Sequence, residues 1–146
     1  MKKMFNTTDN IAYSILRLTL GIVMFPHGAQ KVLGWFGGMG YSATMQAFTT
    51  KMHMPFMLVL LLMAIEFLGS LFLISGFLTR ISAFGIGVAM AVCAAVGHIQ
   101  NGFFMNWFGT QQGEGFEYHI LVVGIATALI IKGAGSFSID KMISGE

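Results

Sequence analysis

Six polar residues could form a binding site in a chain that is otherwise largely apolar. Each lies near one end of a long apolar stretch, and together they comprise three histidines, a lysine, a glutamine and a glutamate: His27, Gln30, Lys31, His98, Glu117 and His119. Histidine exchanges a proton near neutral pH, and lysine supplies a fixed positive charge. The carboxylate can orient either of them, and the amide adds donors. Such a group suits a quinone headgroup or a small oxyanion, because both offer oxygen acceptors.

The same residue types allow other chemistry. Histidine and carboxylate are acceptable transition-metal ligands, here His27, His98, His119 and Glu117, and two histidines on facing helices could ligate a haem. These residues come from separate stretches without the spacing of a metal-binding motif. We therefore expect no metal centre and no built-in cofactor beyond a bound quinone. The alternative to a pocket is interfacial solvation, in which each polar side chain simply reaches water or lipid headgroups.

A second pair of charges lies deeper in the apolar stretches. Arg17 belongs to the first stretch, and Glu66 lies near the middle of the second. A charge at the centre of a membrane helix costs about 2.5–3.5 kcal/mol on insertion scales, and buried charges persist chiefly by pairing. We predict a structural ion pair between Arg17 and Glu66 that joins the first two helices. Half of a proton path is the alternative.

Four apolar stretches position these residues. Of the 146 residues, 55% are hydrophobic and 10% are charged, whereas soluble domains carry about 25% charged residues. This composition identifies an integral membrane protein. The stretches are 11–33, 55–76, 80–100 and 116–132, and a helix needs about 20 residues to cross a bilayer core. We predict an all-α fold in which an antiparallel bundle of four transmembrane helices forms a single domain over 1–146.

The first stretch has a polar stripe along one side. Successive helical residues turn by about 100°, so one sector of the helix contains Arg17, Gly21, Met24, His27, Gly28 and Lys31. We expect this sector to face protein or a wet cavity, since lipid would not accept its charges. Pro26 removes one backbone donor beside His27 and introduces a local irregularity.

The third stretch carries the only cysteine, Cys93, so an internal disulfide is excluded. Small residues recur there at every fourth position: Gly85, Ala89, Cys93 and Gly97. This spacing favours a close helix contact, and we interpret Cys93 as a packing residue. The basic residues are scattered along the chain, so no patch suited to nucleic acid is formed.

The basic residues also predict an orientation, because cytoplasmic loops are enriched in Lys and Arg. Five fall on the side of the termini and the short second loop: Lys2, Lys3, Arg80, Lys132 and Lys141. Lys31 and Lys51 fall on the other side. We therefore expect both termini in the cytoplasm and the two longer loops, rich in Gly and aromatic residues, outside.

Three groups of residues resemble the DoxX family of membrane proteins. They lie in the first helix and loop, in the second helix and turn, and in the fourth helix and exit: Arg17, Gly21, His27, Gly28, Lys31 and Gly34 to Gly38; Glu66, Gly69, Gly76, Thr79 and Arg80; Gly115, Phe116, Glu117, Tyr118, Gly133 to Ser136 and Asp140. The resemblance implies a four-helix, multi-pass protein of the bacterial inner membrane. Some relatives are the small membrane subunit of a thiosulfate:quinone oxidoreductase. Others join oxidoreductase complexes with superoxide dismutase and a sulfurtransferase, and most have no assigned activity.

These observations favour a membrane subunit of a redox complex that handles quinone or a small sulfur oxyanion near the outer face. The chain has no flavin or nucleotide motif and no cysteine pair, so electrons require a partner protein or the quinone. If it is an enzyme, it is an oxidoreductase subunit. The alternatives are a non-catalytic scaffold for partner helices and a small-solute or proton-coupled carrier using Arg17, Glu66 and His27. The expected partners are the lipid bilayer and either a partner protein or a second copy of the chain.

The orientation can be tested by cysteine labelling. In a Cys93→Ser background, Lys141→Cys should react with a membrane-impermeant maleimide only after the membrane is opened. Labelling of Lys141→Cys in intact cells would contradict a cytoplasmic C-terminus. Lys51→Cys, in the loop expected outside, serves as the matched control.

Overall fold

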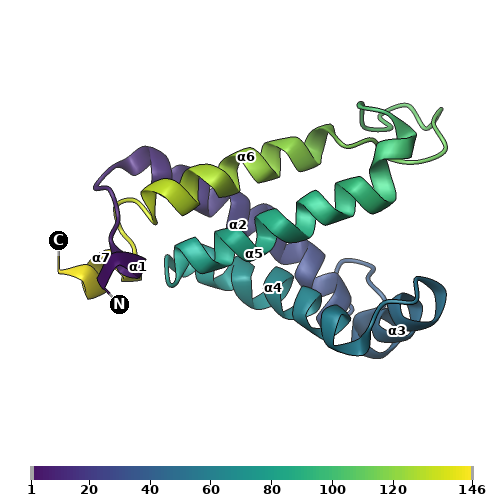
Figure 1. The fold of residues 1–146 in the computed structure, drawn as a ribbon, viewed down its shortest axis with the longest axis horizontal. Helices are drawn as coiled ribbons and strands as arrows, with labels where there is room; N and C mark the ends of the chain where they lie inside the picture. Colours follow the sequence, from purple (N-terminus) through teal and green to yellow (C-terminus); the bar gives the residue numbers. More distant parts are fainter. Residues whose placement is uncertain (1, 146) are drawn as a thin grey trace.

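The regular secondary structure of the described residues is entirely helical. The computed structural model describes residues 2–145, in which no strand occurs; Met1 and Glu146, the ends of the predicted domain, lie outside this range. The four long helices are α2 (Ile11–Val32), α4 (Phe56–Ser75), α5 (Thr79–Cys93) and α6 (Glu117–Lys132). A π-helical turn, η2 (Ala94–His98), and a 3₁₀ turn, η3 (Ile99–Asn101), extend α5. The all-α prediction is confirmed, and successive long helices reverse direction (Figure 1).

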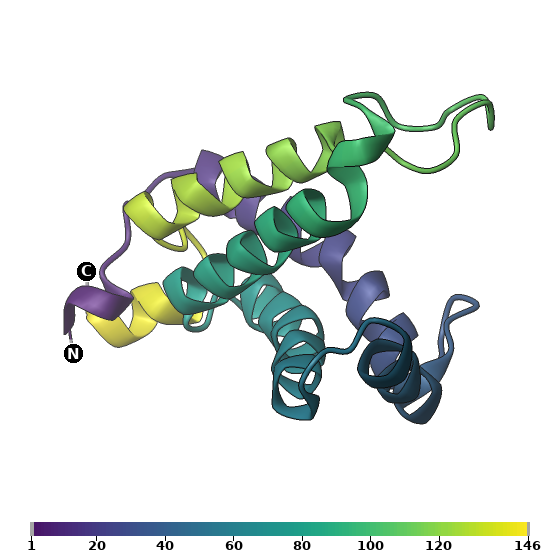
Figure 2. The same ribbon diagram turned by 45° about the vertical axis from the view of Figure 1, so that its right-hand side comes forward.

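The short helices lie at the two ends of the bundle. At one end α1 (Lys2–Phe5) packs near α7 (Ile139–Ser144), and both termini lie there (Figure 1). At the other end lie α3 (Gly40–Gln46), the π-helix η1 (Ala47–Lys51) and the loop 102–116. We call these the terminal end and the loop end. Toward the loop end, the α5–α6 pair diverges from the α2–α4 pair (Figure 2).

Three segments within residues 2–145 are long and apolar enough to cross a membrane. They are Ile11–Val32, Phe56–Ser75 and Thr79–Asn101. The remaining long helix, α6, has 16 residues, which span about 24 Å against a bilayer core of about 30 Å. The chain is thus a multi-pass membrane protein, whereas a fourth span and the side on which the termini lie stay predictions.

Local residues mark the limits of α2 and α4, and a distant carboxylate caps the start of α5. The Asn10 side chain accepts a hydrogen bond from Ala12 N and caps α2. Helix α4 begins after Pro55 and ends at Gly76, whose φ of 71° is the left-handed conformation that glycine adopts at a helix end. The start of α5 is capped from far along the chain, because the Asp140 carboxylate accepts hydrogen bonds from Leu78 N at 2.8 Å and Thr79 N at 2.9 Å.

Two glycines of the predicted stripe let α2 lie directly against α4. A Cβ at Gly28 would lie 2.6 Å from Phe67 Cα, and one at Gly21 would lie 3.0 Å from the backbone oxygen of Ser70. Neither position has room for a side chain. The small-residue spacing in α5 is used only in part: Gly85 packs on Ile65, whereas a Cβ at Gly97 would meet nothing within 4 Å among the described residues.

The predicted ion pair between Arg17 and Glu66 is wrong. Arg17 is 2% exposed, and its guanidinium donates to backbone carbonyls from two segments. The acceptors belong to the last turn of α4 and to the segment after α6: Leu73 O at 2.5 Å, Ile74 O at 2.7 Å, Ala134 O at 3.0 Å and Phe137 O at 3.2 Å. A cation at the C-terminus of a helix is favoured by the helix dipole, and the buried Asp140 carboxylate also interacts favourably with the Arg17 charge.

The register of the two helices explains why the carboxylate is out of reach. Glu66 lies opposite Gly28, and about 16 Å of helix separates Gly28 from Arg17 at 1.5 Å per residue. Hydropathy alone places a residue in depth too coarsely to detect this offset.

We predict that Arg17→Met destabilises the protein strongly. The substitution leaves buried carbonyls without a donor, and hydrogen bonds to a charged group are worth about 1.5–3 kcal/mol each. The free energy of unfolding in detergent should therefore fall by at least about 3 kcal/mol. Leu18→Ala, on the neighbouring and more exposed side chain, is the control and should lower it far less. Equal losses would show that the carbonyl contacts contribute little.

Candidate functional site

An ion pair between α2 and α4 is the centre of the candidate site. Lys31 Nζ lies 2.5 Å from Glu66 Oε2, and the two side chains are 22% and 3% exposed. Lys31 Nζ also lies 3.4 Å from the backbone oxygen of His27. The carboxylate that the sequence analysis assigned to Arg17 is thus the partner of Lys31.

The close contact between the α2 and α4 backbones explains why the Lys31–Glu66 ion pair forms. Gly28 brings α2 against the backbone of α4 at Glu66 and Phe67. Lys31 lies one helical turn further along the same face as Gly28. Its side chain therefore needs only its own length to reach Glu66, and the pair forms between the two helices rather than at the surface.

Two aromatic rings complete what we call the central polar cluster, consisting of His27, Lys31, Glu66 and Tyr118. The rings of His27 and Tyr118 lie 6.2 Å apart and join α2 to α6. The Tyr118 hydroxyl lies 3.6 Å from the sulfur of Met24. The charge of Glu66 acts on both rings, and that of Lys31 acts on His27. Because His27 is exposed, the cluster is open on one side.

A pair of histidines lies beside the cluster. The rings of His98 and His119 are 4.4 Å apart and connect the end of α5 to α6. His98 Nδ1 lies 2.9 Å from the carbonyl oxygen of Glu114; since that oxygen can only accept, Nδ1 donates. His119 is buried.

The other two predicted site residues, Gln30 and Glu117, form hydrogen bonds with loop residues. Gln30 Nε2 donates to the backbone oxygen of Phe36. Glu117 Oε1 accepts hydrogen bonds from Met105 N at 3.0 Å and from Trp107 Nε1 at 3.3 Å. Within residues 2–145, no hydrogen bond joins Glu117 to His27 or Lys31, so the approach of these three residues stays a prediction.

Sequence reasoning missed three members of this region. Glu66 was assigned to the wrong cation, Tyr118 was passed over between Glu117 and His119, and Cys93 was interpreted as packing. The charges of Glu66 and Lys31 act on Cys93 as well. The sequence did contain one signal for the Lys31–Glu66 pair. Gly28 lies one helical turn before Lys31, and a glycine there marks the side on which a neighbouring helix approaches closely.

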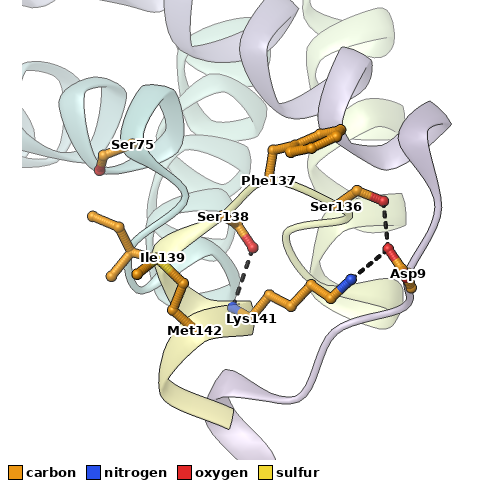
Figure 3. A pocket seen from close by; sticks show the side chains of 8 residues that line it. All are labelled: Asp9, Ser75, Ser136, Phe137, Ser138, Ile139, Lys141 and Met142. Atoms are coloured by element: carbon orange, nitrogen blue, oxygen red, sulfur yellow. Dashed lines mark hydrogen bonds and ion pairs between the residues drawn. The ribbon is translucent and has the colours of Figure 1, made fainter. Parts of the chain in front are cut away.

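A hollow of about 620 Å³ lies at the terminal end and is a different feature (Figure 3). Its polar groups already bind one another. Lys141 Nζ lies 2.7 Å from Asp9, Ser136 Oγ donates to the same carboxylate at 2.6 Å, and these contacts hold the pKa of Asp9 below its ordinary value. These bonds tie the chain ends to the bundle, so we place the candidate site at the loop end.

A comparison with protein families matches residues 12–99 to the family described as DoxX. This range is more than half of the chain. The chain belongs to the DoxX family. No curated protein and no solved structure matches it significantly. The matched range of this DoxX protein includes His27, Lys31, Glu66, Cys93 and His98, and it ends before α6.

The chemistry of the central polar cluster follows from its charges. Lys31 and Glu66 cancel each other, so the cluster has little net charge. It offers donors from lysine and histidine, a proton exchanger in His27 and two aromatic faces. An uncharged ligand with carbonyl acceptors and a planar ring fits these groups.

We predict strong coupling between Lys31 and Glu66 in this DoxX protein. Removing one partner of a buried pair costs about 3–5 kcal/mol, because the remaining charge is left uncompensated. Lys31→Met and Glu66→Gln should each destabilise the protein in detergent, and the double variant should be more stable than the sum of the two effects implies. Additive losses in this double-mutant cycle, measured by reversible unfolding, would mean that the pair is not formed in the membrane protein.

Proposed function

We propose that this DoxX protein is the membrane subunit of a redox complex and binds a quinone headgroup at the central polar cluster. The observation that supports it best is the Lys31–Glu66 pair, held between two helices and flanked by the rings of His27 and Tyr118. Charged groups inside membrane helices are costly and commonly mark ligand or proton sites. Because quinones diffuse within the bilayer, a site between membrane helices is reached without leaving the lipid.

The charge balance favours a quinone over a small sulfur oxyanion. An oxyanion needs an uncompensated positive charge, whereas Lys31 is already paired at 2.5 Å with Glu66. A quinone carbonyl needs only a hydrogen-bond donor, which Lys31 or His27 provides. The quinone ring can also pack against the Tyr118 or His27 ring.

The cluster would supply protons, and a partner would supply or remove electrons. Reducing a quinone to a quinol takes two electrons and two protons. The imidazole of His27 can accept and donate a proton, and the residue is exposed at the cluster. With one cysteine and no flavin motif, the chain depends on a partner protein for the electrons. We propose that the complex lies in the bacterial inner membrane, where such quinones are carried.

The carrier alternative gains no support from the contacts of Arg17. All the described hydrogen bonds of its guanidinium go to backbone carbonyls at the terminal end. The Arg17 side chain therefore has a structural role and does not extend a proton path from Glu66. The photolabelling experiment below distinguishes the scaffold alternative from quinone binding.

The test is photolabelling with an azido-quinone analogue in lipid nanodiscs, followed by peptide mapping. We expect labelling of the α2 and α4 segments around Lys31 and Glu66. Lys31→Met should reduce labelling about tenfold or more, as expected for the loss of a charge-assisted hydrogen bond. Lys51→Met, which removes a lysine from the loop end outside the cluster, should leave labelling unchanged.

Labelling spread evenly over the helices, and insensitive to Lys31→Met, would contradict the proposal. A partner chain that co-purifies with the protein, without quinone and without labelling of the cluster, would favour the scaffold.

A further inference from the structure

We propose that Cys93, His98 and His119 bind one thiophilic transition-metal ion, zinc or copper, at the junction of α5, η2 and α6. This site is separate from the quinone proposal, and neither depends on the other. It also differs from the metal set considered from the sequence, in which Glu117 was a ligand and Cys93 was not.

The positions of the three side chains carry the proposal. The Cys93 sulfur and one ring nitrogen from each histidine all lie within 4.8 Å of one another. Metal–nitrogen bonds of about 2.0–2.1 Å and a metal–sulfur bond of about 2.3 Å at tetrahedral angles place such atoms about 3.3–3.6 Å apart. Closing the site therefore requires each pair of atoms to approach by no more than about 1.5 Å, which small side-chain rotations provide.

The π-helical turn places two of the ligands together. Cys93 and His98 are five residues apart, and in an α-helix they would point about 140° away from each other. Between them η2 (Ala94–His98) replaces α-helical geometry, and a π-helix, with its i→i+5 hydrogen bonds, brings residues at this spacing onto one side. Such turns are frequent at functional sites.

His119 supplies independent evidence for a ligand. It is 6% exposed, and its Nδ1 is buried without a hydrogen-bond partner in the described part of the chain. A buried polar atom left without a partner costs about 1–3 kcal/mol. A metal ion would accept the nitrogen lone pair and remove this cost.

His98 is oriented as metal-ligating histidines usually are. Its Nδ1 donates to the carbonyl oxygen of Glu114 at 2.9 Å. This contact selects the tautomer in which Nε2 carries the free lone pair, and it holds the ring in place. The ring of His119 lies alongside it at 4.4 Å.

The ligand types point to a soft metal. One thiolate and two imidazoles suit zinc and copper, whereas magnesium and manganese prefer oxygen ligands. Glu117 does not belong to this group of ligand atoms; its Oε1 accepts two hydrogen bonds from the loop 102–116. Three protein ligands leave a fourth position for water or another small ligand.

The first test is a cobalt titration of the full-length protein in detergent after treatment with a chelator. We expect one equivalent of Co²⁺ to produce intense tetrahedral d–d bands and thiolate-to-cobalt charge transfer. Cys93→Ser should abolish the charge transfer, and His119→Asn should weaken binding at least tenfold. His53→Asn is the matched control; His53 has a φ of 53°, which asparagine tolerates.

The second test uses the single thiol of the wild-type protein and needs no variant. Cys93 is partly exposed, and a small maleimide should alkylate it in the metal-free protein. One equivalent of Zn²⁺ or Cu⁺ should slow alkylation at least tenfold, and a chelator should restore the rate. When Zn²⁺ and Cu⁺ compete for the protein, elemental mass spectrometry shows which ion remains bound and is therefore preferred. A weak octahedral cobalt spectrum together with unchanged alkylation would overturn the proposal.

Discussion

A buried guanidinium whose described hydrogen bonds all go to backbone carbonyls is the interaction on which this bundle depends. Helix ends leave carbonyl oxygens without intrahelical donors, and Arg17 satisfies those of Leu73 and Ile74 at the end of α4. The same side chain reaches Ala134 O, beyond α6. Arg80 acts similarly, donating to Ile131 O at the end of α6 and to a carbonyl near the N-terminus. In both cases a cation is placed where the helix dipole favours it.

This arrangement separates structural charges from charges available for function. Arg17 binds the end of α4, and Gly28 contacts the middle of α4. These two contacts fix the register of α2 relative to α4. That register brings Lys31 to Glu66 between the two helices, and α6 adds Tyr118. The charged groups of the terminal end, Arg17, Asp140 and the Asp9–Lys141 pair, are bound to backbone or to one another, whereas the Lys31–Glu66 pair lies beside the rings of His27 and Tyr118.

Composition, helix signals and the polar stripe in the sequence predicted the fold class and the approximate helix limits. Pro55 and Gly76 mark the two ends of α4. Their backbone preferences depend on the residue itself and not on distant contacts, so the sequence alone reveals them. The partner of Arg17 was not predictable in this way, since carbonyl acceptors exist at every position and only helix register selects among them. Cys93 was missed for a related reason: a four-residue spacing assumes α-helical geometry, whereas a π-helical turn follows it.

The cap on α5 has a consequence for biosynthesis. The amides of Leu78 and Thr79 receive their acceptor from Asp140, close to the end of the chain, and Phe137 nearby supplies a carbonyl to Arg17. During translation these groups have no partner until residues 137–140 have been made. The hairpins can insert earlier, but a polypeptide that stops before Phe137 lacks both the cap on α5 and one of the carbonyls that bind Arg17.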